Sequence, residues 1–361
     1  MTTQVDKGKW YRSKEITFST GATEVVDPNF LTKALGEMAA PEIAEIIIRA
    51  NGSITASGGT AENYDCHKLL SRVRFTDRAG ELVNLPGSIL KLVDQMEHQG
   101  SHVEPSDVAD AATNAAYEFY TRLDFEPNFA WNPSDYRVPL NHWVNGGQLS
   151  LSFQTPSNFG TPTLTFTVYV RVVDNRFRDL KSRMTWKEYS VSNQEFDYPV
   201  GGSLRAAILT SDLTTTGYTD LSGFTEYDFR DLDLYRHPLA MLQEDYRRER
   251  PSTHSADQYL AATEGAVPLV VPYKGQHIGS MPNLETFHMR LNGAAPASGR
   301  IAICAIENRS GDLGVEWTGA ASVGELASRI RSSGHIPGPK GSKKAMNFPA
   351  KLQRRLPIRF K

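Results

Sequence analysis

The stretch "TLTFTVYVRVV", residues 163–173, decides the fold class of this chain. Its apolar residues recur at every second position, whereas threonines, a tyrosine and an arginine fill the positions between them. Strict alternation with many β-branched and aromatic side chains is typical of a half-buried β-strand. The residues predicted to share its inner face are Leu164, Phe166, Val168, Val170 and Val172. We therefore expect Phe166 and Val168 in a core.

The same alternation recurs on both sides of this strand. It predicts strands over 118–125 ("EFYTRLDF") and 148–154 ("QLSLSFQ"). Further strands are expected over 42–56, over the two halves of 71–85 around a turn at Asp77–Gly80, and over 266–273. Residues 286–307 are predicted to form a hairpin with its turn at 293–299.

Helical signals are few and short. Residues 86–99 carry apolar side chains at i, i+3, i+4 and i+7, which predicts an amphipathic helix. The Ala-rich stretch 105–116 and the stretch 238–250 are weaker candidates. The pattern indicates a mostly-β chain in which short helices connect strands, and many short strands favour sandwiches or barrels.

A length of 361 residues suggests two domains or one large β architecture. The polar stretch 174–189 follows a strong strand and is the expected boundary. We expect an N-terminal arm over 1–13, one sandwich over 14–178, a second over 179–320, and a C-terminal arm over 321–361.

Charge is segregated along the chain. Lys and Arg number 39 and Asp and Glu 41, but ten of the cations lie after residue 328 and no acid follows Glu325. Removing that end leaves 29 cations against 41 acids, a net of −12. A basic, Pro- and Gly-broken end cannot bury a core, so we expect it to act as an arm. Its predicted contacts with a membrane or a neighbouring subunit are Lys340, Lys343, Lys344, Phe348, Lys351, Arg354, Arg355, Ile358, Arg359, Phe360 and Lys361.

No motif for catalysis or a cofactor is present. HExxH, CxxC, GxSxG and the Walker A pattern are absent. Ser88 to Lys91 matches S-x-x-K, but the companion K-T-G is missing, so chance explains the match. We expect no enzyme activity, no catalytic residue, no cofactor and no metal.

Two metal-like spacings have simpler explanations. His98 and His102 stand at i, i+4, which suits a metal on a helix, but two exposed polar residues after a helix end are the simpler interpretation. Asp231 and Asp233 share one strand face, as Ca²⁺ ligands do, although nearby arginines favour surface ion pairs.

Cys66 and Cys304 are far apart in the sequence, which predicts two reduced, buried thiols and synthesis in a reducing cytosol. The N-terminus is polar, and no apolar run is long enough to span a membrane.

Aromatic side chains gather in residues 125–143, "FEPNFAWNPSDYRVPLNHW". They form either a sugar-binding platform or a loop that packs its own aromatics against the sandwich or a neighbouring subunit.

The order of these elements resembles the double jelly-roll major capsid proteins of tectivirus-type, membrane-containing bacterial viruses. The stretches that carry the resemblance are "EIIIRANGSITASGG", "KLLSRVRFTDRAGELVNLPGSILKLVDQMEHQG", "GGQLSLSFQ" with "LTFTVYV", and "VPLVVPYKGQHIGSMPNLETFHMRLNGAAPASGRIAICAIENRS". It covers most of residues 14–310 and is a likeness of layout, because these proteins have no signature motif.

The resemblance implies two tandem eight-stranded jelly-roll sandwiches with short connecting helices and an extended C-terminal arm. It implies a structural capsid protein, made in the host cytoplasm, that forms trimeric pseudo-hexagonal capsomers of an icosahedral virion shell over an internal membrane. The implied partners are two further copies in a homotrimer, neighbouring capsomers and minor capsid proteins, and the anionic lipid of an internal membrane, with nucleic acid less favoured. The alternative is a β-sandwich sugar-binding or adhesion protein, such as a virion spike.

Overall fold

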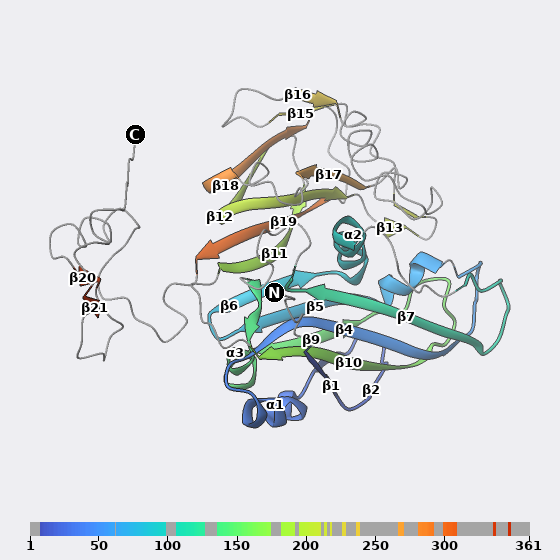
Figure 1. Ribbon diagram of the computed structural model, residues 1–361. Coiled ribbons are helices and arrows are strands. Elements are labelled where there is room, and N and C mark those ends of the chain that lie inside the picture. The colour runs from blue at the N-terminus through green and yellow to red at the C-terminus, as the bar shows by residue number, and fades with distance from the viewer. Residues whose placement is uncertain are drawn as a thin grey trace, which may run out of the picture. The chain divides into compact units, whose positions relative to one another are not determined.

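The structure is a computed structural model (Figure 1). It describes residues 8–61, 63–98, 106–126, 136–174, 182–191 and 195–210, and the shorter segments 213–214, 217–218, 226–228, 236–238, 266–270, 281–291, 299–308, 335–336 and 346–347. The chain divides into two compact units, Met1–Glu307 and Asn308–Lys361, which are described separately.

The first sheet has six strands. They are β1 (Lys9–Arg12), β2 (Ile16–Thr17), β4 (Pro41–Ile54), β7 (Ala115–Asp124), β8 (Val138–Pro139) and β10 (Thr163–Asp174). Their order is β1-β10-β4-β7, with β2 beside β10 and β8 beside β4, and all of these pairs are antiparallel. Part of the segment expected as an N-terminal arm, residues 9–12, is therefore an edge strand of this sheet.

The second sheet has eleven strands (Figure 1). They are β3 (Thr23–Val25), β5 (Leu70–Asp77), β6 (Gly80–Leu85), β9 (Gln148–Phe153), β11 (Ser182–Val191), β12 (Glu195–Thr210), β15 (Glu226–Asp228), β16 (Arg236–Pro238), β17 (Ala266–Val270), β18 (Met281–Leu291) and β19 (Gly299–Asn308). The order is β16-β15-β18-β12-β19-β11-β6-β5-β9-β3, with β17 beside β12.

The six-stranded sheet and strands β6-β5-β9-β3 enclose one apolar core, and together they form the first roll. Phe166 and Val168 of β10 are fully buried, which confirms the prediction made for this strand. The ring of Phe166 lies 4.8 Å from that of Phe153 on β9, so the aromatic contact joins the two sheets. Aromatic pairs at this distance add to the free energy gained by burial.

The strands predicted over 42–56, 71–85, 118–125 and 148–154 are present as β4, β5 with β6, β7, and β9. The turn predicted at Asp77–Gly80 is also present. The Asp77 carboxylate accepts a hydrogen bond from the backbone N–H of Ala79 at 2.9 Å, and Gly80 has φ +132°. A glycine tolerates this backbone conformation without a steric penalty.

Helices are short and connect strands. They are η1 (Pro28–Leu31), α1 (Thr32–Glu37), η2 (Asn63–Leu69), α2 (Gly87–His98) and α3 (Leu140–Val144). Helix α2 confirms the amphipathic helix predicted over 86–99. The helix proposed for 105–116 is wrong: Val108 forms an isolated bridge with Ala61, and strand β7 begins at Ala115. The candidate helix at 238–250 lies outside the described residues.

The predicted hairpin over 286–307 is also wrong. Both arms are strands, β18 and β19, but β12 lies between them. Residues 195–204 of β12 pair with β18, and residues 203–210 pair with β19 on its other side. The 16-residue β12 thus lies between the two strands, which would pair directly with each other in a hairpin.

Two short pairs complete the described strands. In the first unit, β13 (Leu213–Thr214) pairs with β14 (Gly217–Tyr218). In the second unit, β20 (His335–Ile336) pairs antiparallel with β21 (Met346–Asn347), within the residues expected to form the basic arm.

Candidate functional site

Strands β6 and β11 pair in parallel, with Trp186 opposite Val83 and Lys187 opposite Asn84. We call this pairing, with the side chains that bridge it, the seam. The stretch 174–189, expected as a polar boundary, is therefore in its second half a strand. Met184 and Trp186 of β11 are 3% exposed and belong to the core.

Arg183 of β11 holds the β5–β6 turn at one end of the seam. Its guanidinium donates to the backbone carbonyls of Ala79 at 3.1 Å and Glu81 at 3.0 Å. Its Nη2 also lies 3.4 Å from Oδ1 of Asp77, whose side chain is fully buried. A buried carboxylate without a cation is costly, so Arg183 stabilises the turn from the neighbouring strand.

Glu188 of β11 bridges two arginines at the other end. Its Oε2 lies 2.5 Å from Nη1 of Arg72 on β5, and its Oε1 lies 2.7 Å from Nη1 of Arg300 on β19. The Glu188 side chain is only 4% exposed, whereas both arginines are more than a third exposed. One carboxylate thus connects the strands on the two sides of β11.

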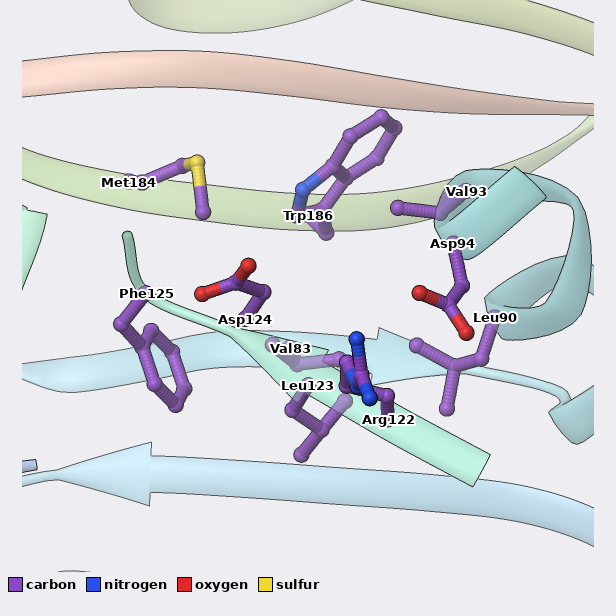
Figure 2. A pocket seen from close by; sticks show the side chains of 10 residues that line it. All are labelled: Val83, Leu90, Val93, Asp94, Arg122, Leu123, Asp124, Phe125, Met184 and Trp186. Atoms are coloured by element: carbon purple, nitrogen blue, oxygen red, sulfur yellow. The ribbon is translucent and has the colours of Figure 1, made fainter. Parts of the chain in front are cut away.

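A small hollow lies where β11 passes over helix α2 and the end of β7 (Figure 2). Asp94 of α2 and Asp124 of β7 extend into it below Met184 and Trp186, as Figure 2 shows. Its volume is about 20 Å³, which accommodates on the order of one water molecule. Small-molecule sites are usually at least about tenfold larger, so this hollow is too small to enclose a substrate.

Titratable side chains from η2 and α2 meet beneath the same helix. Cys66, His67 and Asp94 are buried, and Lys91 lies among them. Burial lowers the pKa of Lys91 to about 8, because the charged amine loses solvation. Burial lowers the pKa of His67 well below its usual value, and the charge of Lys91 adds to this effect.

The metal-like and catalytic motifs of the sequence can be compared with the described residues. Within them, no group of three His, Cys, Asp or Glu side chains is placed to hold a metal ion, and no helix is long and apolar enough to span a bilayer. Ser88 lies in the first turn of α2, and Lys91 belongs to the titratable group described above. Cys66 and Cys304 are both buried free thiols, as predicted.

The aromatics of residues 125–143 that the structure describes are buried. Phe125, Tyr136 and Trp143 are 1%, 8% and 0% exposed, and the Trp143 ring lies 5.3 Å from that of Phe75. These three pack against the sandwich, as the second interpretation expected, and do not form an exposed sugar-binding platform. Phe129 and Trp131 lie outside the described residues.

The residues predicted to contact a membrane or a neighbouring subunit also lie outside the described residues. This applies to all eleven, from Lys340 to Lys361, and also to His102, Asp231 and Asp233. Their roles therefore stay predictions. The residues that bridge the seam were missed, because the stretch that contains Arg183 and Glu188 was interpreted as a polar boundary. The alternation of Met184 and Trp186 with polar residues was the available signal.

Comparison with solved structures defines the class of fold. The crystal structure of the STIV major capsid protein matches with a TM-score of 0.56 and 12% identity, over 83% of this chain and 96% of that chain. A chain of the Sulfolobus turreted icosahedral virus structure matches at 0.57 and 11%, over 90% and 97%. The PBCV-1 virus capsid matches at 0.53 and 10%, over 85% and 95%.

These proteins are double jelly-roll major capsid proteins, so the chain has the double jelly-roll fold. No protein-family model matches the sequence, and no curated protein sequence matches it either. At 10–12% identity the likeness establishes the fold and leaves function to a separate argument.

Proposed function

We propose that this protein is the structural subunit of an icosahedral virus shell. One observation carries the proposal: the fold matches capsid proteins over almost their whole length, 95–97% of each, within a single chain. Capsid proteins of this fold need rigid sandwiches with few exposed sheet edges, and face-to-face sheets of the kind seen in the first roll meet that need.

The shell subunit would be a homotrimer. Two rolls per chain, over about 14–178 and 179–320, give six sandwiches per trimer, which suits a pseudo-hexagonal capsomer that packs against its neighbours and against minor capsid proteins. Within each chain, Arg183 and Glu188 join β11 to the first roll. The protein would reside in the virion after synthesis in the host cytoplasm.

The basic C-terminal end would act as an arm that binds outside its own fold. Ten cations and no acid follow residue 328, interleaved with apolar residues such as Phe348 and Phe360. Near an anionic bilayer each Lys or Arg contributes about 1 kcal/mol, and apolar anchors add to this. The arm would contact the anionic lipid of an internal membrane or the acidic flank of a neighbouring subunit, in preference to nucleic acid.

Oligomeric state and particle shape test the shell function. We expect the purified full chain to elute as a trimer in size-exclusion chromatography with light scattering, and to show hexagonal or triangular capsomers in negative stain. A strict monomer at every concentration would overturn the proposal. Binding of the monomer to a glycan array would favour the adhesion alternative instead.

A truncation tests the arm separately. Removal of the residues after Gly334 should leave folded trimers and weaken both particle assembly and binding to anionic vesicles. The lost binding should be sensitive to salt, because charge attraction is screened over about 10 Å at 0.1 M salt. Normal assembly and unchanged vesicle binding by the truncated chain would contradict this role.

A further inference from the structure

The side of the six-stranded sheet that points away from the core is here called the outer face. Strand register decides which residues share it, because directly opposed residues in a sheet point to the same side. Trp10 of β1 is opposite Arg171 of β10, and Arg12 is opposite Tyr169. Across β10 and β4, Tyr169 is opposite Ile47 and Arg171 is opposite Glu45. The core-facing residues of β10 between these positions are buried.

Aromatic rings and arginines dominate the part of this face around Tyr169 and Arg171. The members around Tyr169 are Trp10, Arg12, Glu45, Ile47, Arg49, Glu118, Tyr120, Arg122, Asp124, Tyr169 and Arg171, and the same face continues along the strands through Asn51, Ser53, Thr163, Thr165 and Thr167. Trp10 is 48% exposed, and the Arg12 guanidinium lies 6.0 Å from the centre of the Tyr169 ring. Trp, Tyr and Arg are the residue types most enriched in the centres of protein interfaces.

Acidic partners hold the arginines of this face in place. Glu45 binds Arg122 at 2.8 Å and Arg171 at 3.1 Å, although burial still raises the pKa of its carboxyl group. Arg49 donates to Glu118 at 2.8 Å. Side chains fixed before binding lose less conformational entropy when a partner covers them.

Strand β7 ends this network on the far side from β1. The Tyr120 hydroxyl donates to the same Glu118 Oε1 that accepts from Arg49, at 2.5 Å. The hydrogen bond from Arg49, with that from Tyr120, lowers the pKa of Glu118, so the carboxylate stays charged near neutral pH. The polar part of the face is therefore ordered from β4 to β7.

The corresponding side of strands β6-β5-β9-β3 differs in composition. Ser150 and Ser152 of β9 alternate with buried leucines and face outward, and Thr23 of β3 bonds Ser152 at 2.8 Å. Arg74 of β5, 56% exposed, pairs with Glu81 of β6. The aromatic residues of β5 and β9, Phe75 and Phe153, are buried in the core. No aromatic ring of β3, β5, β6 or β9 faces outward, so the two sides of the first roll are unequal in the aromatic area they offer a partner.

The charge of the outer face selects the kind of partner. Its four arginines are matched by four acids: Arg12 pairs with Glu15, Arg49 with Glu118, Arg122 with Glu45, and Arg171 with both Glu45 and Glu126. Nucleic acids and anionic bilayers bind surfaces with an excess of positive charge, which this face lacks. A charge-balanced, aromatic and preorganised surface is complementary to protein of similar composition.

We propose that the outer face, with Trp10 as its exposed anchor, is a contact surface between copies of this chain. The proposal rests on the shell function, because in a shell the most numerous neighbours of each subunit are other copies of the same chain. It assigns one side of the first roll, and not the other, to subunit contact.

A matched pair of substitutions tests the assignment in the full chain. Trp10 and Val25 are the exposed large hydrophobic residues among those described, at 48% and 53% exposure, and they lie on edge strands of the two different sheets. Trp10→Glu should weaken self-association about tenfold or more, as loss of an aromatic anchor does. Val25→Glu, an equal change in charge on the other sheet, should leave self-association within about twofold. Both variants should melt within a few degrees of the wild type.

Analytical ultracentrifugation over a concentration series gives the association constant of each variant. Equal association by the wild type and Trp10→Glu would overturn the outer-face proposal while leaving the shell function intact. A wild type that never associates would overturn both. If Trp10→Glu loses binding to vesicles of phosphatidylglycerol and phosphatidylcholine but keeps self-association, the surface contacts lipid and the proposal is wrong. If Trp10→Glu itself unfolds, Tyr169→Ser replaces it with the same expected loss, and full association by that variant would also contradict the proposal.

Discussion

The core of the first roll around Phe166 is apolar, whereas the seam beside it buries charged side chains. The ring of Phe166 packs against those of Phe153, Phe119 and Phe18, which all belong to the first roll. At the seam, Arg183 and Glu188 are buried instead and bind partners on other strands.

The difference separates stability from specificity. Apolar burial is roughly proportional to area and indifferent to direction, so the core supplies most of the folding free energy. Buried ion pairs gain little net free energy, because desolvation offsets the Coulomb attraction, but one wrong partner leaves a charge unmatched. We therefore expect the core to determine whether the roll folds and the seam to determine where β11 docks.

The largest effect is expected in the core. Phe166→Ala should lower the free energy of unfolding by about 3–5 kcal/mol, because it removes a fully buried ring and leaves a cavity. Urea denaturation followed by circular dichroism measures this loss. Thr163→Ala, at an exposed position of the same strand, should change stability by less than about 0.5 kcal/mol. Equal stability of the two variants would show that β10 is not the closing strand of the core.

The next effect is expected at the seam. Arg183→Met keeps an unbranched apolar stem but removes the cation from the buried Asp77, and should cost about 2–4 kcal/mol. A double-mutant cycle with Asp77→Asn checks the reason. The cost of Arg183→Met should shrink in the Asp77→Asn background, since no buried charge is then left without its cation. Full additivity would mean that Arg183 acts only through the two carbonyls it binds.

A smaller effect should follow pH at Lys91, under helix α2. Burial lowers its pKa to about 8 in the folded protein from the ordinary lysine value of 10.5, which it keeps in the unfolded chain, so the unfolded chain holds more protons between these values. Stability should therefore rise with pH from about 8 to 10.5, by about 2 kcal/mol after allowance for partial exposure. Below pH 8 both states are protonated and the penalty is fully present.

Chemical denaturation at pH 7.5 and 9.5 tests this sign. Lys91→Met should be more stable than the wild type at pH 7.5, and the difference should narrow at pH 9.5. The comparison between the two proteins removes the contribution of other groups that titrate in this range. A difference that does not change with pH would show that Lys91 is solvated in the folded protein.

The smallest effect is expected at Glu188. Glu188→Gln removes one buried charge, but both of its arginines are more than a third exposed and regain water, so the loss should be about 1 kcal/mol. Glu24→Gln on the exposed strand β3 is the control and should be neutral. A loss as large as that of Phe166→Ala would mean that the seam contributes as much to folding as the core does.

Local alternation was sufficient to predict the strands of the first roll from sequence. In β10 and β9 each apolar residue faces the core and each polar residue faces away, so period two appears directly in the sequence. Long-range pairing was not predictable in this way. Nothing in residues 286–307 indicates that β12, about 90 positions earlier, separates β18 from β19.

One local error and one omission have physical causes of their own. Residues 105–116 are rich in alanine, which favours a helix, but the tertiary bridge between Val108 and Ala61 overrides that preference. Arg183 and Glu188 were interpreted as signs of a polar boundary, because a sequence does not show that a distant Asp77 or Arg72 will neutralise them. The outer face was missed for the same reason, since it is assembled from four strands distant in sequence.

The two cysteines of the chain have a practical consequence for measurement. Cys66 lies in η2 of the first roll, Cys304 lies in β19 beyond the seam, and neither thiol is exposed. A buried thiol reacts with a labelling reagent only when its surroundings open, so the rate of labelling reports the free energy of local opening. The natural sequence thus has one thiol on each side of the seam whose labelling rate reports local opening. Mass spectrometry of the two labelled peptides would time the opening of each side independently, without any engineered residue.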